Sequence, residues 1–208
     1  MTDPSTPSAG RLAGRVAFVS GGASGIGLAA ARLFAAEGAQ VAVADIDAPA
    51  AEAAAGAIAA DGGEAAAVPL DVTDEAGWDR AVASVAARWG APNAWIFSAG
   101  IADSRPVADT ALADWRRVMA VNLDGVFLGT RAAIRAMRRG GRGGGQGGSI
   151  VILSSVSGMK AVPGAGAYAA SKAALRLFAK SAALEVAGEN IRINTVLPGG
   201  VATPIWRG

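Results

Sequence analysis

Short apolar runs alternate along this chain with longer stretches in which the apolar residues recur at helical spacing. We predict strands at 15–20, 40–46, 64–72, 93–100, 149–155 and 191–199. Helices are predicted between them, at 26–38, 48–60, 73–89, 112–137 and 167–187. The predicted strands are mostly apolar along their whole length, which is typical of a parallel sheet covered on both faces. The alternation therefore predicts an α/β fold, a doubly wound parallel sheet with helices on both faces.

Three positions refine this outline. Pro69 has no backbone N–H, so we expect it at an end of the third strand or at an edge of the sheet. Thr73 is predicted to cap the helix that runs to Trp89. The glycine-rich segment 140–148 separates a helix from a strand and is predicted to be a flexible surface loop. Arg-Gly segments can bind RNA, but this one has no aromatic residue, so RNA binding is the less favoured interpretation.

The chain contains no histidine and no cysteine among its 208 residues. This excludes Ser-His-Asp and Cys-His catalysis, zinc sites built on imidazole or thiolate, and disulfides. Any chemistry must use carboxylates, hydroxyls, lysine, arginine or a bound cofactor, and we predict no metal site. The net charge is only +2, with 19 basic and 17 acidic residues, so no nucleic-acid partner is predicted.

No sequence feature predicts secretion or a membrane span. Residues 1–13 contain Pro, Ser and Thr but lack the apolar core of a signal peptide, and they are predicted to be a flexible tail. No apolar run is long enough to cross a bilayer, and the lack of cysteine fits a reducing compartment. We expect a cytoplasmic protein without a membrane partner, in which residues 14–208 form one domain.

The first predicted strand runs directly into the sequence SGGASGIG, residues 20–27. Glycines at 21, 25 and 27 permit backbone conformations that other residues avoid, and they let a ligand approach the main chain. The N–H groups at the start of the following helix can bind a pyrophosphate. Asp45 ends the second strand, where a carboxylate would accept hydrogen bonds from an adenosine ribose and repel a 2′-phosphate. We therefore predict a Rossmann-type site for NAD, with NADP less favoured.

The sequence YAASK, residues 168–172, holds the only tyrosine of the chain. Tyr168 and Lys172 are four positions apart, so on a helix they share one face. A phenol has a pKa of about 10, and a neighbouring ammonium favours its ionised form. Such a phenol can exchange a proton with an alcohol or a ketone. An isolated pair of this spacing is more often an ordinary surface contact, but Ser154 and Ser155 end a predicted strand, at the edge where open α/β sheets bind ligands.

From about Gly14 to Thr203, the chain closely resembles the short-chain dehydrogenase/reductase family in its ordinary single-domain branch. The resemblance rests on several ordered motifs: SGGASGIG (20–27), Asp45, LDV (70–72), SAG (98–100), VNLDG (121–125), SSVSG (154–158), YAASK (168–172) and NIRINTVLPGGVATP (190–204). It implies an NAD(H)-dependent oxidoreductase that interconverts a secondary alcohol and a ketone.

The resemblance also implies roles for individual residues. Tyr168 would be the general acid/base, and Lys172 would favour its ionised form and hold the nicotinamide ribose. Ser155 would bind the substrate oxygen, and Asn122 would order a proton relay that reaches Lys172. The residues expected to bind the cofactor are Gly21, Ser24, Gly25, Ile26, Gly27, Asp45, Ile46, Asp71, Val72, Ser98, Ala99, Gly100, Tyr168, Lys172, Pro198, Gly199, Val201 and Thr203.

The chain departs from the family pattern in two respects that affect these expectations. Ser98 stands where the family has an asparagine, which weakens the expected support of the central strand. The sequence ends at TPIWRG, so the substrate-covering segment and the last strand of the family are expected to be missing. A catalytically impaired dinucleotide-binding sensor or scaffold is therefore the alternative function. The resemblance further implies a homo-oligomer, a dimer or a tetramer, in which the helix at 112–137 and the helix carrying Tyr168 pair across an axis.

Overall fold

The computed structural model describes residues 10–139 and 147–206. Its described residues form one six-stranded parallel sheet in the order β3-β2-β1-β4-β5-β6. The strands are β1 (Val16–Ser20), β2 (Gln40–Asp45), β3 (Glu64–Pro69), β4 (Ala94–Phe97), β5 (Gly148–Leu153) and β6 (Ile191–Val196). The strand order reverses between β1 and β4, which is where open α/β sheets bind ligands at the carboxyl ends of their strands. The predicted doubly wound fold is confirmed.

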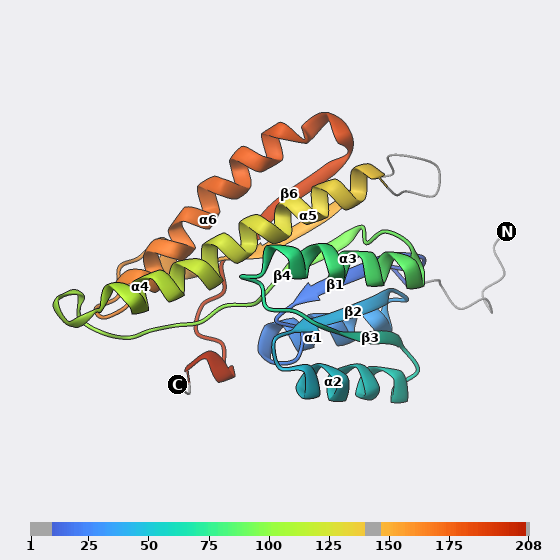
Figure 1. The fold of residues 1–208 in the computed structure, drawn as a ribbon, viewed down its shortest axis with the longest axis horizontal. Coiled ribbons are helices and arrows are strands. Elements are labelled where there is room, and N and C mark those ends of the chain that lie inside the picture. The colour runs from blue at the N-terminus through green and yellow to red at the C-terminus, as the bar shows by residue number, and fades with distance from the viewer. Residues whose placement is uncertain (1–9, 140–146, 207–208) are drawn as a thin grey trace, which may run out of the picture.

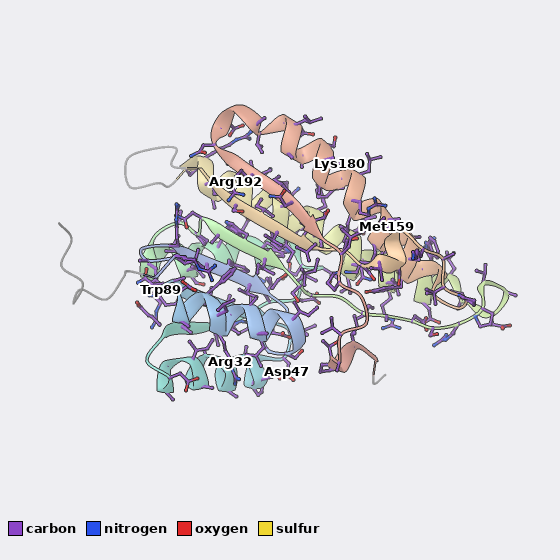
Figure 2. The ribbon with its side chains drawn as sticks, turned by 180° about the vertical axis from the view of Figure 1, so that it is seen from behind. Arg32, Asp47, Trp89, Met159, Lys180 and Arg192 are labelled. Atoms are coloured by element: carbon purple, nitrogen blue, oxygen red, sulfur yellow. The ribbon has the colours of Figure 1, made fainter. Side chains whose placement is uncertain are left out.

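Helices cover both faces of the sheet (Figures 1 and 2). The helices are α1 (Gly25–Ala36), α2 (Ala48–Ala60), α3 (Glu75–Trp89), α4 (Leu112–Met119), α5 (Gly125–Arg139) and α6 (Gly166–Glu185). Helices α1 and α2 pack on one face through small side chains such as Ala31 and Ala51. Helices α3, α5 and α6 pack on the other face, through Trp78, Ala133 and Leu175 respectively. Successive strand residues point to opposite faces, so the sheet separates two apolar cores.

Four large aromatic residues form the centre of the α3 side. Phe18 stacks on Trp95 with ring centroids 4.9 Å apart, and Trp78 meets Phe97 edge to face at 5.7 Å. Gly129 of α5 lies directly over this group, because a Cβ there would come within 2.7 Å of the Trp78 ring and 2.8 Å of Phe97. The bulk of the aromatic rings therefore determines how closely α5 approaches the sheet.

Some predicted boundaries were wrong in detail. Thr73 does not cap α3: Asp74 holds the N-cap position, and the Thr73 hydroxyl instead donates to Asp71 Oδ1 at 2.8 Å. The third and fourth strands end at Pro69 and Phe97, earlier than predicted, because the residues that follow turn toward the ligand edge. Pro69 lies both at the end of its strand and on an edge strand, as expected.

The long helix predicted at 112–137 is continuous but irregular. A π-helical turn at Ala120–Asp124 joins α4 to α5. A π turn inserts one extra residue into the helix, and such turns are frequent at functional sites. This turn contains Asn122, whose side chain is fully buried. The irregularity thus changes the direction in which one predicted site residue points.

One edge strand is covered on one face only. In β6, Ile191 and Ile193 are buried, whereas Arg192, Asn194 and Val196 are exposed. The alternation of polar and apolar residues in IRINTV has the period of a half-buried strand. Most of the glycine-rich loop predicted at 140–148, namely 140–146, and the first nine residues of the predicted tail lie outside the described residues. No helix in the described part of the chain is long and apolar enough to span a membrane.

Candidate active site

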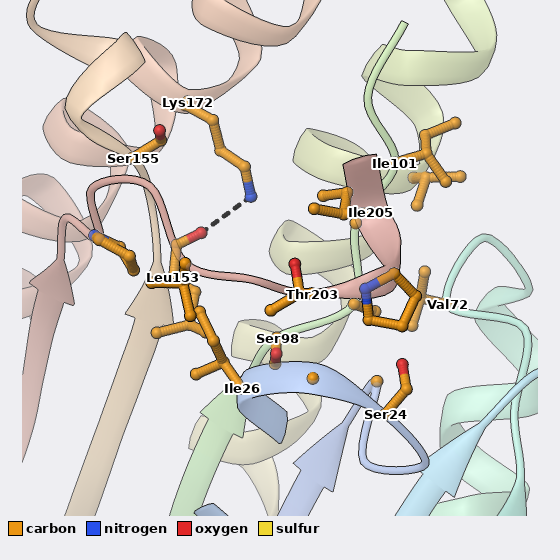
Figure 3. Close-up of a pocket in the computed structure, with 18 of the residues that line it drawn as sticks. Ser24, Ile26, Val72, Ser98, Ile101, Leu153, Ser155, Lys172, Thr203 and Ile205 are labelled. Carbon is orange, nitrogen blue, oxygen red and sulfur yellow. Dashed lines mark hydrogen bonds between the residues drawn. The ribbon is translucent and has the colours of Figure 1, made fainter. Parts of the chain in front are cut away.

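A cavity of about 440 Å³ opens at the carboxyl ends of the strands, beside the point where the strand order reverses (Figure 3). Its wall contains every predicted site residue except Gly27 and Asn122. These residues come from sequence segments distributed along the whole chain, and the sheet brings them to one edge. Seven further residues line the cavity that were not among the predicted site residues: Leu70, Ile101, Val121, Leu153, Ser154, Pro204 and Ile205.

The glycine turn after β1 forms the floor of this cavity. Gly21 and Gly25 have φ angles of +67° and +52°, which side chains rarely allow. A Cβ on Gly21 would lie 2.5 Å from the backbone nitrogen of Ala99, so the turn and the end of β4 are in direct contact. Helix α1 begins at Gly25, and its N-cap residue Ser24 makes no side-chain capping bond. The first N–H groups of α1 therefore remain suited to an anionic group.

Gly27 lies behind the cavity wall and does not line it. A Cβ at Gly27 would lie 2.0 Å from the carbonyl oxygen of Gly21 and 3.2 Å from Ser98 Oγ. Its place in the motif therefore follows from close packing of the helix against the turn. Ser98 stands where an asparagine was expected, and its hydroxyl lies beside the position that a Cβ of Gly27 would take. Its backbone N–H donates a hydrogen bond to the carbonyl oxygen of Ser20 at 3.0 Å.

Asp45 ties the end of β2 to the glycine turn. Its Oδ2 accepts a hydrogen bond from the N–H of Ala23 at 3.1 Å, and its Oδ1 accepts one from the N–H of Asp47 at 3.2 Å. Each carboxylate oxygen can accept a further bond. A negative charge is thus held beside the turn. The only cation among the described lining residues is Lys172, which Figure 3 shows across the cavity from Ser24 of the turn.

The adjoining part of the cavity wall is formed by the residues that come directly after β3. Val72 is buried, and its carbonyl oxygen accepts a hydrogen bond from Trp78 Nε1 at 3.0 Å. Gly125 permits the close approach of α5, because a Cβ there would lie 2.9 Å from Val72 Cγ2. Asp71 Oδ1 accepts from both the backbone and the hydroxyl of Thr73. These contacts hold Asp71 and Val72 at the cavity, beside the exposed Ile46.

Tyr168 and Lys172 lie one turn apart near the start of α6, and both are buried. The Lys172 Nζ atom lies 5.6 Å from the centroid of the Tyr168 ring. It donates a hydrogen bond to the carbonyl oxygen of Leu153 at 2.9 Å, drawn as the dashed line in Figure 3. Burial lowers the pKa of Lys172 to about 8, because desolvation penalises the ammonium. The pair therefore shares one face, as the spacing predicted.

Two serines connect the end of β5 to α6 and to the cavity. The Ser154 hydroxyl donates to the carbonyl oxygen of Lys172 at 2.7 Å, which fixes the distance between strand and helix. Ser155 Oγ accepts from the N–H of Ser157 at 3.1 Å. A hydroxyl can donate as well as accept, so Ser155 is able to offer its hydrogen to an oxygen in the cavity.

Asn122 joins three segments instead of lining the cavity. Its Oδ1 accepts from the N–H of Ile101, and its Nδ2 donates to the carbonyl oxygen of Ile101, both at 2.9 Å. Nδ2 also donates to Ser171 Oγ at 3.1 Å. Gly100 leaves the space between Asn122 and Lys172 open, because a Cβ there would lie 3.3 Å from Asn122 Oδ1 and 3.5 Å from Lys172 Nζ. The expected relay would therefore cross this space rather than run through a direct contact.

The segment after β6 crosses the glycine turn. A Cβ on Gly25 would lie 3.2 Å from Thr203 Cγ2, and the carbonyl oxygen of Pro198 accepts from the N–H of Val156. Pro198, Gly199, Val201 and Thr203 thus all reach the cavity. Two of the unpredicted residues, Leu153 and Ile101, contribute backbone groups to the site, and Ser171 contributes a buried hydroxyl. No residue-type signal in the sequence marks the roles of Leu153 and Ile101, although Ile101 directly follows the SAG motif, whereas Ser171 lies within the YAASK motif.

Comparison with known proteins shows the family to which the chain belongs. The family model of the short chain dehydrogenases matches residues 15–208. The chain is 41% identical to a 2,5-dichloro-2,5-cyclohexadiene-1,4-diol dehydrogenase of Sphingobium indicum, over 95% of this chain and 77% of that protein. It is 43% identical to the NADP-dependent (R)-specific alcohol dehydrogenase of Lentilactobacillus kefiri, over 94% of this chain and 76% of that protein.

A solved structure is similar to this chain over most of its length. A dehydrogenase/reductase from Sinorhizobium meliloti 1021 superposes with a TM-score of 0.87 and 36% identity, over 93% of this chain and 75% of that one. The fold and the ligand edge define an oxidoreductase of the class that binds a nicotinamide dinucleotide. The chain belongs to the short-chain dehydrogenase/reductase family.

Proposed function

We propose that this protein is an NAD-dependent dehydrogenase that interconverts a small secondary alcohol and a ketone, with Tyr168 as the general acid/base. One observation carries the proposal. The cavity of about 440 Å³ at the glycine turn and a second cavity of about 330 Å³ share four wall residues, and these include Tyr168 and Ser155. Two hydroxyl groups therefore lie where a dinucleotide in one cavity would meet a small molecule in the other.

The residues present fit a dinucleotide. The glycines of the turn bring the backbone at the start of α1 to the cavity wall, and the N–H groups of that first turn suit a pyrophosphate. Asp45 would accept hydrogen bonds from the adenosine ribose, while Asp71 and Val72 would flank the adenine. Thr203 and Lys172 would hold the nicotinamide end. A bound nicotinamide would supply the hydride acceptor, which no side chain can replace.

The protein's own groups would perform the proton chemistry. Ser155 would donate a hydrogen bond to the reacting oxygen and hold it beside the phenol. Tyr168 would take the hydroxyl proton of an alcohol, or return it to a ketone. The Lys172 ammonium, 5.6 Å from the Tyr168 ring, would favour the ionised phenol. Asn122 would act indirectly, by holding Ile101 and Ser171 and thereby the wall beside Lys172.

Charge supports NAD as the preferred cofactor. A 2′-phosphate would lie beside the carboxylate of Asp45, and the described wall of the cavity contains no cation near the turn. Repulsion between the phosphate and this carboxylate would disfavour the binding of NADP. Because the Lentilactobacillus kefiri relative is NADP-dependent, cofactor preference has to be measured on this chain.

The assembly and the location belong to the same proposal. We propose a cytoplasmic homo-oligomer in which residues 14–208 form one dinucleotide-binding domain, without a nucleic-acid or membrane partner. Exposed apolar side chains on α5 and α6 support pairing of these helices between copies: Phe127 is 44% exposed, Leu177 73% and Leu184 80%. Light scattering of the purified protein would measure the number of copies.

A substrate panel tests the proposed reaction. The protein is incubated with NAD and a series of secondary alcohols, and NADH formation is followed by absorbance. NAD-induced thermal stabilisation provides the binding control. Turnover of at least one secondary alcohol is expected. Stabilisation by NAD without any turnover would contradict the enzymatic proposal and support the sensor or scaffold instead.

A further inference from the structure

The smaller cavity has a carboxylate on its wall that the proposed reaction does not use. Asp103 lines this cavity of about 330 Å³ together with Tyr168 and Ser155. Its Oδ1 lies 3.3 Å from Nε of Arg105, whereas its Oδ2 is buried and has no hydrogen-bond partner among the described residues. Burying a carboxylate oxygen without a donor costs free energy, so this atom requires an explanation.

The loop that carries Asp103 is anchored on both sides. Ile101, two residues earlier, exchanges two hydrogen bonds with Asn122. Arg105, two residues later, donates its backbone N–H to the carbonyl oxygen of Gly164 at 2.9 Å. Gly164 has a φ of +78° and allows this close approach, since a Cβ there would lie 3.3 Å from Ser104 Oγ. Asp103 is therefore held at the cavity and cannot easily turn into solvent.

Arg105 provides a charge partner for Asp103 on one of its two oxygens. The guanidinium of Arg105 contacts Asp103 and also donates a hydrogen bond to Asp114 of α4. Asp114 also lies 3.9 Å from Arg117, so it has a second cation, whereas Oδ2 of Asp103 remains an unused acceptor among the described residues. Most of the remaining wall is apolar, from Ala102, Val156, Val162, Pro163, Ala165 and Ile205. Such a site suits a compact, largely apolar molecule with a neutral donor on the side facing Asp103.

We propose that Asp103 determines specificity by accepting a hydrogen bond from a second hydroxyl group of the substrate, which is therefore a small diol or the corresponding hydroxyketone. This inference rests on the proposed function, because the first hydroxyl must meet Tyr168 and Ser155. The cavity lies at the lower end of the roughly 300–1,000 Å³ range of ligand pockets. A ligand that fills it contacts Asp103 as well as Tyr168 and Ser155, so one group can react while another meets Asp103.

A substrate pair tests this on the unmodified protein. Cyclohexane-1,4-diol and 4-methoxycyclohexanol share the ring and the reacting hydroxyl, but the ether oxygen cannot donate a hydrogen bond. Because a hydrogen bond to a charged group contributes about 1.5–3 kcal/mol, kcat/KM should be at least about tenfold higher for the diol. Equal values would overturn the proposal. A higher value for 4-aminocyclohexanol than for the diol would overturn the assignment of a neutral hydroxyl.

Two variants separate the hydrogen bond to Asp103 from the general effect of negative charge near Arg105. In Asp103→Leu, which keeps the branched shape of the side chain but has no acceptor atom, the ratio of the two kcat/KM values should fall to about one. In the control Asp114→Asn, which removes a carboxylate from the same arginine but outside the cavity, the preference for the diol should remain. An unchanged ratio in Asp103→Leu, or its loss in Asp114→Asn, would overturn the proposal. Asp103→Ala, which also has no acceptor atom, replaces the leucine variant if the latter does not fold.

A binding measurement keeps this inference separate from the proposed reaction. Thermal stabilisation by the diol and by the methoxy alcohol is compared in Tyr168→Phe with NAD present, where turnover is not needed. Stronger stabilisation by the diol, lost on adding Asp103→Leu, supports the contact with Asp103 even if no alcohol is oxidised. Equal stabilisation by the two alcohols overturns it, even if the enzyme turns over other secondary alcohols.

Discussion

The ammonium nitrogen of Lys172 donates a hydrogen bond to the backbone carbonyl oxygen of Leu153, at 2.9 Å. This bond joins α6 to the last residue of β5. It holds a buried cation 5.6 Å from the centroid of the Tyr168 ring. The cation thereby lies beside the phenol, and the carboxylate of Asp45 lies beside the glycine turn. The cavity consequently has a positive and a negative end.

Removing the phenol hydroxyl should abolish most turnover. In Tyr168→Phe, kcat is expected to fall by about 10²–10⁴-fold, the usual contribution of a general acid/base. NAD affinity should change little, because the ring and Lys172 remain. Steady-state kinetics with any alcohol that the protein oxidises measures the first quantity, and NAD-induced thermal stabilisation measures the second. A variant that kept most of its activity would disprove the assignment of Tyr168.

Replacing Lys172 by methionine should change how stability depends on pH. Burial lowers the pKa of Lys172 to about 8 from 10.5, so between these values the unfolded chain binds more protons at this residue than the folded chain. Stability attributable to Lys172 therefore rises as pH rises from about 8 to 10.5. Below pH 8 the full cost of burying the ammonium is present, on the order of 3 kcal/mol.

The measurement is the difference in free energy of unfolding between Lys172→Met and the unmodified protein, from urea titrations at a series of pH values. Methionine removes the buried charge, so the variant should gain most, relative to the unmodified protein, near neutral pH. Its relative gain should shrink toward pH 10.5. Loss of the bond to Leu153 adds an offset that does not vary with pH. A difference that is constant over this range would contradict the expected titration.

Neutralising Asp45 should weaken the preference for NAD. The Asp45→Asn variant removes the charge that repels a 2′-phosphate, so the ratio of the NADP and NAD dissociation constants should fall by about tenfold, which corresponds to about 1.4 kcal/mol. Calorimetric titration with each dinucleotide measures this ratio. The control Asp47→Asn removes a neighbouring charge outside the cavity wall and keeps a residue able to cap α2. Tighter binding of NADP than NAD by the unmodified protein would refute the cofactor proposal.

Two glycines should respond in opposite directions to the same substitution. Gly129→Ala would place a Cβ within 2.7 Å of Trp78, so overpacking should lower the free energy of unfolding by about 1–3 kcal/mol. Gly56 lies inside α2 with no atom near its Cβ position, and alanine there should raise stability by about 0.5–1 kcal/mol. Denaturant titrations compare the two variants. A stabilising effect at Gly129 would show that α5 is packed less tightly against the aromatic rings.

Most residues of the cavity wall could be predicted because they have local signals in the sequence. The glycines at 21 and 25 mark a turn with positive φ, and the spacing of Tyr168 and Lys172 is one helical turn. Thr73 was misassigned because the choice of a cap depends on competing partners, here the carboxylate of Asp71. The carbonyl group of Leu153 gave no signal, because every residue has one.

The order of strands and helices along the chain, the glycine turn and the Tyr-Lys pair followed from the sequence by itself, since hydrophobic period and helical spacing are properties of neighbouring residues. The tertiary structure alone decided that Asn122 holds Ile101 and Ser171, that Lys172 is buried with a lowered pKa, and that Asp103 faces the same cavity as Tyr168. These relationships join segments far apart in the chain. They depend on how helices pack on the sheet, which the local pattern of residues does not specify.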